Sequence, residues 1–351
     1  MRIGIVLPNW IGDAVMATPA LRALRESVGS DATLIGIMKP LIADVLAGTD
    51  WLDESMPYDR RSRDPQLKSA AVAARLRERR LDRILLLTNS FSSGLLAWRS
   101  GAPQRIGSAR YGRSLLLTDA LPVPRKKGRI VPYSPVGHYL QIVAHAGSLG
   151  ASRQVELALT DADRRSVDSV WRELGFDTEQ RVVVFNNGGG YGAAKRWPTE
   201  HFVELAHRVV HKTDSSVLMV CGPAERDDAA HFERQAGHPR VRSLSAFDPD
   251  IGLTKACAQR SIAVVSTDSG VRHFAAGFSK PSVALFGPMN PAASENYHSA
   301  EVRLQLELSC SPCGKRVCPL GHHRCMRELS VATVFDALAR QLLPAAGDSA
   351  A

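Results

Sequence analysis

Three short segments of the sequence combine glycine with charged or hydroxyl side chains, and each one follows a run of apolar residues. The first covers residues 8–13 and ends in Gly12 and Asp13. As the cap of a helix, Asp13 would stabilise that helix by about 1 kcal/mol. As a general base, the same carboxylate would accept a proton from an attacking hydroxyl. The residues alone leave both interpretations of Asp13 open.

The second segment, residues 186–198, is rich in backbone donors and positive charge. Gly190 and Tyr191 lie within its glycine-rich part, and Lys195 comes just before the start of a predicted helix at Pro198. Exposed backbone amides, a helix N-terminus and a lysine together favour a diphosphate group. The segment matches neither the Walker loop nor the dinucleotide-binding glycine pattern. The alternative is a flexible loop with a solvated basic pair, and we favour phosphate binding.

The third segment, residues 266–273, leads from an apolar run into a predicted helix. Ser269 and Gly270 lie where the N-terminal amides of that helix should face a ligand. Asp268, which only accepts hydrogen bonds when ionised, suits the hydroxyls of a sugar. The alternatives are that Asp268 caps the helix and that His273 is a buried residue of its core-facing side.

Four of the six cysteines crowd into one stretch near the C-terminus. Four thiols at this density can form a tetrahedral zinc site, but the spacing lacks the paired Cys-x2-Cys units typical of such sites. We therefore favour reduced structural thiols and leave zinc as the alternative. The four residues are Cys310, Cys313, Cys318 and Cys325.

Length and charge narrow the class of protein. The 351 residues suffice for two domains, at about 100–200 residues each. Lys and Arg number 44 against 35 Asp and Glu, a net charge of +9 at pH 7. Such a balance favours a phosphorylated or membrane-borne substrate. A nucleic-acid partner is disfavoured, because no known binding module is present and the aromatic residues do not interleave with a basic stripe.

No apolar run is long enough to span a bilayer. The N-terminal residues have the pattern of a first buried strand and its loop rather than that of a signal peptide. We therefore expect a cytoplasmic protein.

Short apolar runs alternate with helical patterns along the chain. Strands that are apolar on both sides and joined by helices predict parallel sheets covered on both faces. The pattern occurs once before about residue 150 and restarts near Arg181, which predicts an α/β fold of two doubly wound domains. The predicted strands are 3–7, 33–38, 84–88, 182–185, 216–221, 262–266 and 282–286, and the predicted helices are 14–25, 67–80, 162–174, 199–211, 226–236, 271–277 and 331–343.

We place the two domains at residues 1–165 and 166–330, with a boundary that could lie anywhere from residue 148 to residue 180, followed by a C-terminal helix and frayed tail at 331–351. Residues 122–135 contain four prolines and are predicted to be a loop. Ligands of open parallel sheets bind outside the carboxyl ends of the strands. The three segments described above should therefore line a cleft between the domains.

Taken together, these segments resemble the ADP-heptose:lipopolysaccharide heptosyltransferases. The resemblance runs from residue 1 to about residue 340. Residues 89–91 and the C-terminal cysteines look more like heptosyltransferase II than heptosyltransferase I. The matching residues are 10–13, 18–21, 80–83, 86–91, 194–198, 267–270, 273 and 285–288.

The resemblance implies a GT-B fold, in which two Rossmann-like domains face a cleft. It implies that the N-terminal domain binds a lipid-linked lipopolysaccharide core and that the C-terminal domain binds ADP-L-glycero-D-manno-heptose. Asp13 would be the catalytic base and Lys195 the main phosphate ligand. Transfer would proceed by direct displacement with inversion. It would need neither a metal nor another cofactor, since Lys195 and helix amides meet the charge of the leaving group.

The resemblance also assigns the remaining donor contacts. Asp268, Ser269, Gly270 and His273 would hold the donor sugar and diphosphate, and Gly190 and Tyr191 would contribute from the glycine-rich loop. Arg272 departs from the family pattern, in which an apolar residue is more usual. It is expected either to pair with phosphate or to alter the choice of donor.

Several arginines fall in the predicted acceptor domain. Guanidinium groups suit bidentate pairing with phosphates or with the Kdo carboxylates of the acceptor, and a solvated basic face is the equally good alternative. A lipid-linked acceptor further implies peripheral contact with the cytoplasmic face of the inner membrane. The arginines are Arg60, Arg61, Arg63, Arg105, Arg110 and Arg113.

Three other functions stay open at this point. A related glycosyltransferase would use another donor or acceptor. A sugar-nucleotide epimerase of the same fold would turn over its donor without an acceptor. A catalytically inactive binding protein is the third alternative, and the presence of Asp13, Lys195 and Asp268 argues against it.

Overall fold

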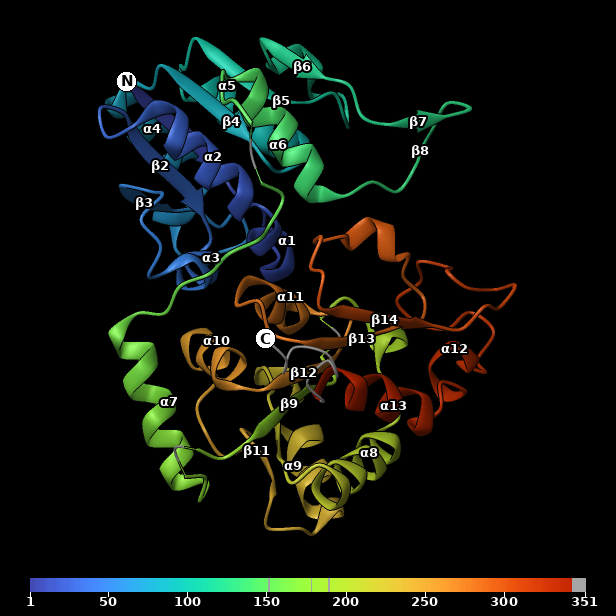
Figure 1. Cartoon of the computed structure of the whole chain (residues 1–351). Helices are drawn as coiled ribbons and strands as arrows, with labels where there is room; N and C mark the ends of the chain where they lie inside the picture. The colour runs from blue at the N-terminus through green and yellow to red at the C-terminus, as the bar shows by residue number, and fades with distance from the viewer. Residues whose placement is uncertain (151, 178, 189, 343–351) are drawn as a thin grey trace, which may run out of the picture. The chain divides into compact units, whose positions relative to one another are not determined.

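The computed structural model describes residues 1–150, 152–177, 179–188 and 190–342. They form two units, each built on its own six-stranded sheet (Figure 1). Unit 1 comprises Met1–Ala158 and Ala292–Tyr297, and unit 2 comprises Leu159–Pro291 and the chain from His298 onward. The prediction of an α/β protein with two Rossmann-like domains is confirmed.

The sheet of unit 1 has the strand order β3-β2-β1-β4-β5-β6, and all its neighbouring strands pair in parallel. Helices α2 and α6 cover one face and α4 and α5 cover the other (Figure 1). The elements are β1 (Arg2–Val6), α1 (Ile11–Met16), α2 (Thr18–Val28), β2 (Thr33–Met38), α3 (Pro40–Leu46), β3 (Glu54–Pro57), the short 3₁₀ turn η1 (Pro65–Leu67), α4 (Ser69–Arg79), β4 (Arg83–Leu86), α5 (Phe91–Arg99), β5 (Gln104–Ser108), η2 (Arg113–Leu116), β6 (Asp119–Leu121) and α6 (Pro135–His145).

Unit 2 repeats this architecture with the strand order β11-β10-β9-β12-β13-β14, again parallel throughout. Its elements are α7 (Asp161–Glu173), β9 (Val182–Asn186), η3 (Ala193–Lys195), α8 (Thr199–Lys212), β10 (Ser216–Met219), η4 (Pro223–Glu225), α9 (Arg226–Ala236), β11 (Val241–Ser243), α10 (Ile251–Arg260), β12 (Ala263–Thr267), α11 (Gly270–Gly277), β13 (Ser282–Phe286), β14 (Glu301–Gln305), α12 (Arg324–Arg327) and α13 (Val331–Leu342). The 3₁₀ turn η5 (Pro291–Ser294) begins at the last residue of this part of unit 2 and continues into the segment of unit 1 that starts at Ala292.

The boundary between the units lies after Ala158, within the expected range of residues 148–180 and seven residues before the division at 165/166. Helix α7 begins at Asp161 with a capping box between Thr160 and Asp163, so a boundary at 165 would cut it. The whole of α7 belongs to unit 2. Helix α13 also belongs to unit 2, where it packs on α8 and β13. The predicted frayed tail at 345–351 lies outside the described residues.

Two local predictions need correction. The single helix predicted at 14–25 is two helices, α1 and α2, separated at Ala17. Pro19 explains the break, because its ring and missing N–H cannot continue a helix that began at Ile11. The predicted loop at 122–135 contains an antiparallel hairpin formed by β7 (Arg125–Lys126) and β8 (Arg129–Ile130), which projects from unit 1 (Figure 1).

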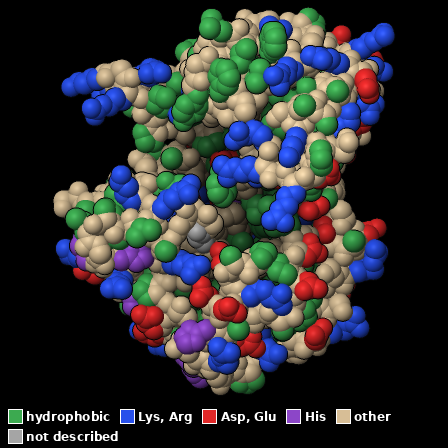
Figure 2. Space-filling view, turned by 180° about the vertical axis from the view of Figure 1, so that it is seen from behind, with side chains coloured by type: hydrophobic (Ala, Val, Ile, Leu, Met, Phe, Trp, Pro, Cys, Tyr) green, Lys and Arg blue, Asp and Glu red, His purple; other side chains and the backbone are tan. Residues whose placement is uncertain are grey.

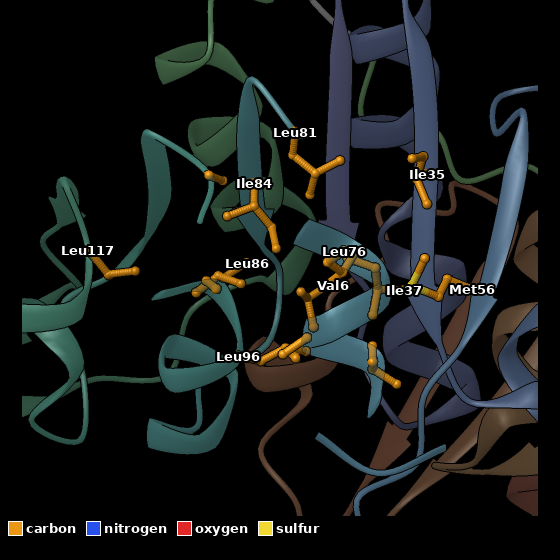
Figure 3. Packing of buried hydrophobic residues seen from close by; sticks show 14 residues of the cluster. Val6, Ile35, Ile37, Met56, Leu76, Leu81, Ile84, Leu86, Leu96 and Leu117 are labelled. Carbon is orange, nitrogen blue, oxygen red and sulfur yellow. The ribbon is translucent and has the colours of Figure 1, made fainter. Parts of the chain in front are cut away.

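The core of unit 1 includes a cluster of aliphatic side chains between the sheet and the helices α4 and α5 (Figure 3). Ile35 and Ile37 of β2 and Ile84 and Leu86 of β4 contribute from the sheet, and Leu76 contributes from α4. All five side chains are fully buried. Alternate residues of a strand point to one face of a sheet, so the 35/37 and 84/86 pairs present a continuous apolar surface to the helices.

We expect Leu76→Ala to lower the free energy of unfolding by roughly 2–5 kcal/mol, because it leaves a cavity under a helix without disturbing helix propensity. The matched control is Leu41→Ala in α3, since Leu41 is 43% exposed and Leu76 is 0% exposed. Calorimetric unfolding of both variants checks the expectation. Equal losses in the two variants would contradict the placement of Leu76 in the core.

Candidate active site

The segments predicted to carry chemistry follow the central strands at which the order of each sheet reverses. This reversal lies between β1 and β4 in unit 1 and between β9 and β12 in unit 2. Connections from such a pair of strands run to opposite faces of the sheet, which leaves a crevice at their carboxyl ends. Asp13 follows β1, Lys195 follows β9 and Asp268 follows β12.

Lys195 and Asp268 form an ion pair in unit 2. The Lys195 Nζ donates to the Asp268 Oδ2 at 2.7 Å and to its carbonyl oxygen at 2.9 Å. Both side chains are largely buried. Burial by itself would raise the pKa of Asp268, but the charges of Lys195 and Arg272 outweigh it and the pKa is lowered. Tertiary folding thus joins the second and third predicted segments through an ionised carboxylate.

Arg272 extends this pair into a buried chain of charges. Its Nη1 lies 3.3 Å from the Asp268 Oδ1, and its Nε and Nη2 donate to the two oxygens of Glu301 at 2.6 and 2.9 Å. The Arg272 side chain is completely buried. The expected pairing of Arg272 with a donor phosphate is therefore not what the structure shows, because its guanidinium group is paired with carboxylates inside the unit.

His273 lies beside this chain and is uncharged. Burial and the neighbouring guanidinium of Arg272 lower the pKa of His273 to about 3. The side chain is buried, as the core alternative predicted, and its Nε2 lies 3.4 Å from the Arg272 Nη1. A neutral imidazole offers one donor and one acceptor, so His273 adds polarity at this position but no charge.

The glycine-rich loop is tied to the start of α11 by side-chain hydrogen bonds. The Asn186 Oδ1 accepts from the Gly188 N–H at 3.1 Å and from the Ser269 hydroxyl at 2.7 Å. The Thr267 hydroxyl donates to the Gly188 carbonyl at 2.8 Å. Ser269 is the N-cap residue of α11, which excludes the alternative that Asp268 caps this helix.

The cysteine-rich segment 310–325 supports the loop that presents Lys195. The Ala194 N–H donates to the Arg316 carbonyl at 3.0 Å, and the Tyr191 hydroxyl donates to the Gly314 carbonyl at 3.0 Å. A Cβ on Gly192 would lie 2.4 Å from the Arg316 carbonyl oxygen, so only glycine fits there. Gly190, also predicted as a donor contact, is exposed. Sequence analysis missed this support, because nothing links the two segments in sequence.

All four cysteines of this segment line one cavity of about 320 Å³, together with His322 and His323. The thiols are free. Backbone N–H groups, that of His323 above all, lower the pKa of Cys318, whereas burial and the other three thiols raise the pKa of Cys325. Among the described residues no three such side chains are grouped closely enough to hold a metal ion. The zinc alternative therefore gains no support from this geometry.

A second cavity, of about 350 Å³, opens beside the glycine-rich loop at the carboxyl ends of β9 and β10. Most of its lining is apolar, and Glu225 and Asp228 add carboxylates at its side. The Glu225 Oε2 accepts from the Gly222 N–H at 2.9 Å. Sequence analysis missed this cavity, because its apolar members have the spacing of ordinary core residues. The lining residues are Asn187, Gly188, Thr199, Phe202, Met219, Val220, Cys221, Glu225, Asp228, Ala229 and Phe232.

Asp13 lies in the first turn of α1 in unit 1 and is partly exposed. The N-cap residue of α1 is Trp10, which makes no side-chain capping bond. Asp13 is therefore not the N-cap, although a carboxylate in this turn still favours the helix dipole. Burial raises the pKa of Tyr139 far above its usual value, and the charge of the nearby Asp13 adds to this effect. The phenol stays neutral beside a carboxylate that solvent can reach.

The predicted acceptor arginines differ in exposure. Arg60, Arg61 and Arg63 are exposed between β3 and α4. Arg110 is half-buried and donates to the Tyr111 and Tyr133 hydroxyls, at 3.1 and 3.4 Å.

Arg113 is fully buried and connects the ends of two strands. Its Nε donates to the Ser108 carbonyl at 2.8 Å and its Nη1 donates to the Thr88 carbonyl at 2.6 Å. Burial and the charge of Arg110 lower the pKa of Arg113 to about 10. As it lies, Arg113 supports the loops after β4 and β5, and a direct contact with the acceptor stays a prediction.

Comparison with known proteins now adds to this geometry. Residues 69–324 match the model of glycosyltransferase family 9 (heptosyltransferase), which is more than half of the chain. The chain belongs to this family. As a heptosyltransferase-family protein, it is a glycosyltransferase rather than an epimerase or an inactive binding module.

The relatives and structures it is similar to agree with this assignment. It is 25% identical to lipopolysaccharide heptosyltransferase 2 of Escherichia coli K12, over 98% of this chain and 99% of that protein. It is 32% identical to lipopolysaccharide heptosyltransferase 1 of Pseudomonas aeruginosa, but over only 42% of each chain. The solved structure of E. coli ADP-heptose lps heptosyltransferase II shares its fold, with a TM-score of 0.78, 22% identity and coverage of 97% and 98% of the two chains.

The buried charge chain leads to a stability prediction. We expect Glu301→Gln to lower the free energy of unfolding by roughly 3–5 kcal/mol, because it leaves the buried Arg272 without its main counter-charge. The control is Glu204→Gln, whose partner Arg208 lies 2.7 Å away on an exposed helical face, and which should cost less than about 1 kcal/mol.

Thermal unfolding at several pH values checks this prediction. Burial would raise the pKa of Glu301, but the hydrogen bonds and charge of Arg272 outweigh it and the pKa is lowered. The stabilisation is thus present above the ordinary glutamate pKa of 4.5 and is lost as the pH falls through the folded-state pKa. The gap between the native protein and Glu301→Gln should narrow in acid, and a constant gap would contradict the ion-pair origin.

Proposed function

We propose that this protein transfers L-glycero-D-manno-heptose from ADP-heptose to a lipid-linked inner core of lipopolysaccharide, as a heptosyltransferase II. The observation that carries the proposal is the Lys195–Asp268 pair at the carboxyl ends of β9 and β12, beside a largely apolar cavity of about 350 Å³. A cation, a helix N-terminus and an apolar cavity match the diphosphate and nucleoside of a nucleotide sugar. The similarity to heptosyltransferase 2 over nearly the full chain supports the choice of donor and acceptor.

In this proposal each part of the donor has its own partner in unit 2. The nucleoside occupies the cavity, where Glu225 is positioned to accept from ribose hydroxyls. The diphosphate binds Lys195 and the first turn of α11 at Ser269 and Gly270. Asp268 accepts from hydroxyls of the sugar, and His273 adds a neutral polar contact. The glycine-rich loop with Gly190 and Tyr191 contributes backbone and aromatic contacts.

The chemical step needs a base and a stabilised leaving group. Asp13 takes the proton of the acceptor hydroxyl, whose oxygen attacks the anomeric carbon as the bond to the diphosphate breaks. The new glycosidic bond then has inverted configuration, and the released ADP carries the charge. Lys195 and the α11 amides stabilise that charge before the step begins, which is the most effective form of electrostatic catalysis. We propose on this ground that no metal or cofactor takes part.

We further propose that the enzyme works at the cytoplasmic face of the inner membrane, where a lipid-linked acceptor would be held. None of the described helices is long and apolar enough to cross a membrane. The exposed Arg60, Arg61 and Arg63, with the half-buried Arg110, are the proposed contacts for acceptor phosphates and carboxylates.

An assay of ADP release tests the transfer reaction and the role of Asp13 as its general base. With ADP-heptose and a lipopolysaccharide acceptor that carries one heptose, we expect acceptor-dependent release of ADP that is unchanged by EDTA. Asp13→Asn should lower kcat by roughly 10²–10⁴-fold, because general base catalysis is lost. The control is Asp44→Asn, which removes an exposed carboxylate from α3 of the same unit.

Each other outcome of this assay has a definite meaning. ADP release without acceptor would replace transfer by hydrolysis or epimerisation of the donor. Preference for an acceptor that lacks heptose would replace heptosyltransferase II by heptosyltransferase I. Full activity in Asp13→Asn would remove the proposed base, and no turnover of ADP-heptose would remove the proposed donor.

A substitution of Lys195 tests its proposed role as the ligand of the donor diphosphate. Lys195→Met should lower kcat/KM for ADP-heptose by about 10²–10³-fold, because a fixed cation at the leaving group is lost. The control is Lys255→Met, since Lys255 is also buried in unit 2 and lies 3.5 Å from the Asp163 carboxylate. Both variants should lose stability, but only Lys195→Met should weaken ADP binding measured by calorimetry. Equal ADP affinity in the two variants would contradict the proposed role of Lys195.

A further inference from the structure

The excess positive charge of the chain is concentrated in one stretch of unit 1. Residues 83–155 contain ten Lys or Arg and a single acidic residue, Asp119. The whole chain has 44 Lys or Arg and 35 Asp or Glu, so the rest of the chain holds 34 of each and is neutral. The net charge of +9 therefore lies entirely within residues 83–155.

Four of these cations lie on the projecting β7–β8 hairpin. Arg125, Lys126, Lys127 and Arg129 are all exposed, and the hairpin is only two residue pairs long. Figure 2 shows blue Lys and Arg side chains at the tip of this projection, clear of the rest of unit 1. A hairpin this short buries almost nothing of its own. Packing within unit 1 therefore does not explain why the chain extends these charges into solvent.

Helix α5 of the same unit is apolar on two opposite sides. Leu96 and Ala97 face the core, as expected. Phe91, Leu95 and Trp98 follow one another at the i, i+4 and i+7 positions of the opposite side, which form one stripe on a helix. Phe91 is 50% and Trp98 is 55% exposed. An outward apolar stripe of this kind marks an interaction surface rather than ordinary surface composition.

Two more exposed apolar side chains connect this stripe to the hairpin. Tyr111 and Leu115, which is 94% exposed, lie on the segment that includes η2. On one side this segment packs on α5, because Gly94 of α5 closely approaches Arg113 and Leu116. On the other side it contacts the chain a few residues before and after the hairpin, at Leu121 and Tyr133. The Ala109 N–H donates to the Leu121 carbonyl at 2.7 Å, and Arg110 donates to the Tyr133 hydroxyl at 3.4 Å.

We propose that these features form a docking face for an anionic lipid bilayer. We define this docking face by the hairpin cations (Arg125, Lys126, Lys127 and Arg129) and the apolar side chains Phe91, Leu95, Trp98, Tyr111 and Leu115. Figure 2 shows green hydrophobic side chains beside the base of the cationic projection. The inference deepens the proposed function, on which it rests, since a lipid-linked acceptor must be reached at a membrane.

The chemistry of the docking face favours a bilayer over a protein partner. Surfaces that bind the interface of an anionic membrane combine Lys and Arg with Trp, Tyr and Leu, as this docking face does. The core of a protein–protein interface is instead depleted of charge and shaped to one partner. Here the cations lie on the projecting hairpin and the apolar side chains lie on α5 and the segment that includes η2, and a fluid anionic surface can contact both at once.

The test is sedimentation of the full-length protein with lipid vesicles that contain no lipopolysaccharide. We expect strong binding to phosphatidylcholine vesicles that include phosphatidylglycerol, weak binding to phosphatidylcholine alone, and loss of binding at high salt. The combined variant Arg125→Gln, Lys126→Gln, Lys127→Gln and Arg129→Gln should bind the anionic vesicles about 100-fold more weakly. The control removes four exposed cations of unit 2 by Arg164→Gln, Arg165→Gln, Lys212→Gln and Arg234→Gln, and has the same net charge.

A second pair of variants tests the apolar part. Trp98→Gln with Leu115→Gln should weaken binding to the anionic vesicles about tenfold, and by the same factor at every salt concentration at which the native protein still binds, because burial of apolar area is not screened. The control is Leu41→Gln with Val317→Gln, since Leu41 and Val317 are exposed apolar side chains that lie outside the docking face. Equal binding by each variant and its control, or equal binding to neutral and anionic vesicles, would overturn the proposal.

Activity on a deacylated, water-soluble acceptor separates this proposal from the proposed function. The fourfold hairpin variant and the Trp98→Gln, Leu115→Gln variant should transfer heptose to the soluble acceptor at the native rate. Their transfer rate should fall only when the acceptor is held in vesicles. A loss on the soluble acceptor would mean that the hairpin binds the glycan itself, which would overturn the docking role. Vesicle binding by a protein that does not transfer heptose would remove the proposed function and leave the docking face in place.

Discussion

The proposed donor site of this protein depends on a buried chain of alternating charges. Lys195, Asp268, Arg272 and Glu301 come from four separate elements or loops, and each is paired with the next. A buried charge is costly unless it is paired and hydrogen-bonded, so none of these groups can move without exposing another. The chain of charges therefore holds Lys195 and Asp268 in fixed positions, and fixed positions are what electrostatic catalysis would require of the role proposed for them.

The two sheets decide where this chain can form. Parallel strands need helices on both faces, and the switch in strand order sends those helices apart at one point of each sheet. In unit 2 that point brings the loops after β9 and β12 together, although Lys195 and Asp268 are 73 residues apart in sequence. In unit 1 the same switch places Asp13 after β1 and the loop of Thr88 after β4. One topology thus prepares two sites of different chemistry.

Positive charge has different uses in the two units. In unit 2, Lys195 and Arg272 are buried and paired. Their charges are therefore held in fixed positions, and salt screens their interactions little. In unit 1, the hairpin cations are exposed and unaccompanied by acidic residues between 120 and 155. Their field is long-ranged and weak at any one point, which suits attraction to a surface rather than recognition of a single group. Four of the ten cations in residues 83–155 serve this second use.

The sequence by itself determined the fold class, the family and the loops that hold Asp13, Lys195 and Asp268. These follow from local patterns, since apolar runs specify buried strands and glycine with charged residues specifies ligand loops. Only the tertiary structure decided that Arg272 pairs with Glu301, that Gly192 rests on Arg316, and that an apolar cavity adjoins the glycine-rich loop. Each of these joins residues distant in the chain, and a single sequence holds no record of which distant side chains meet. The exposed stripe on α5 belongs to the same class, because a helix that is apolar on both sides has the pattern of a buried one until its neighbours are known.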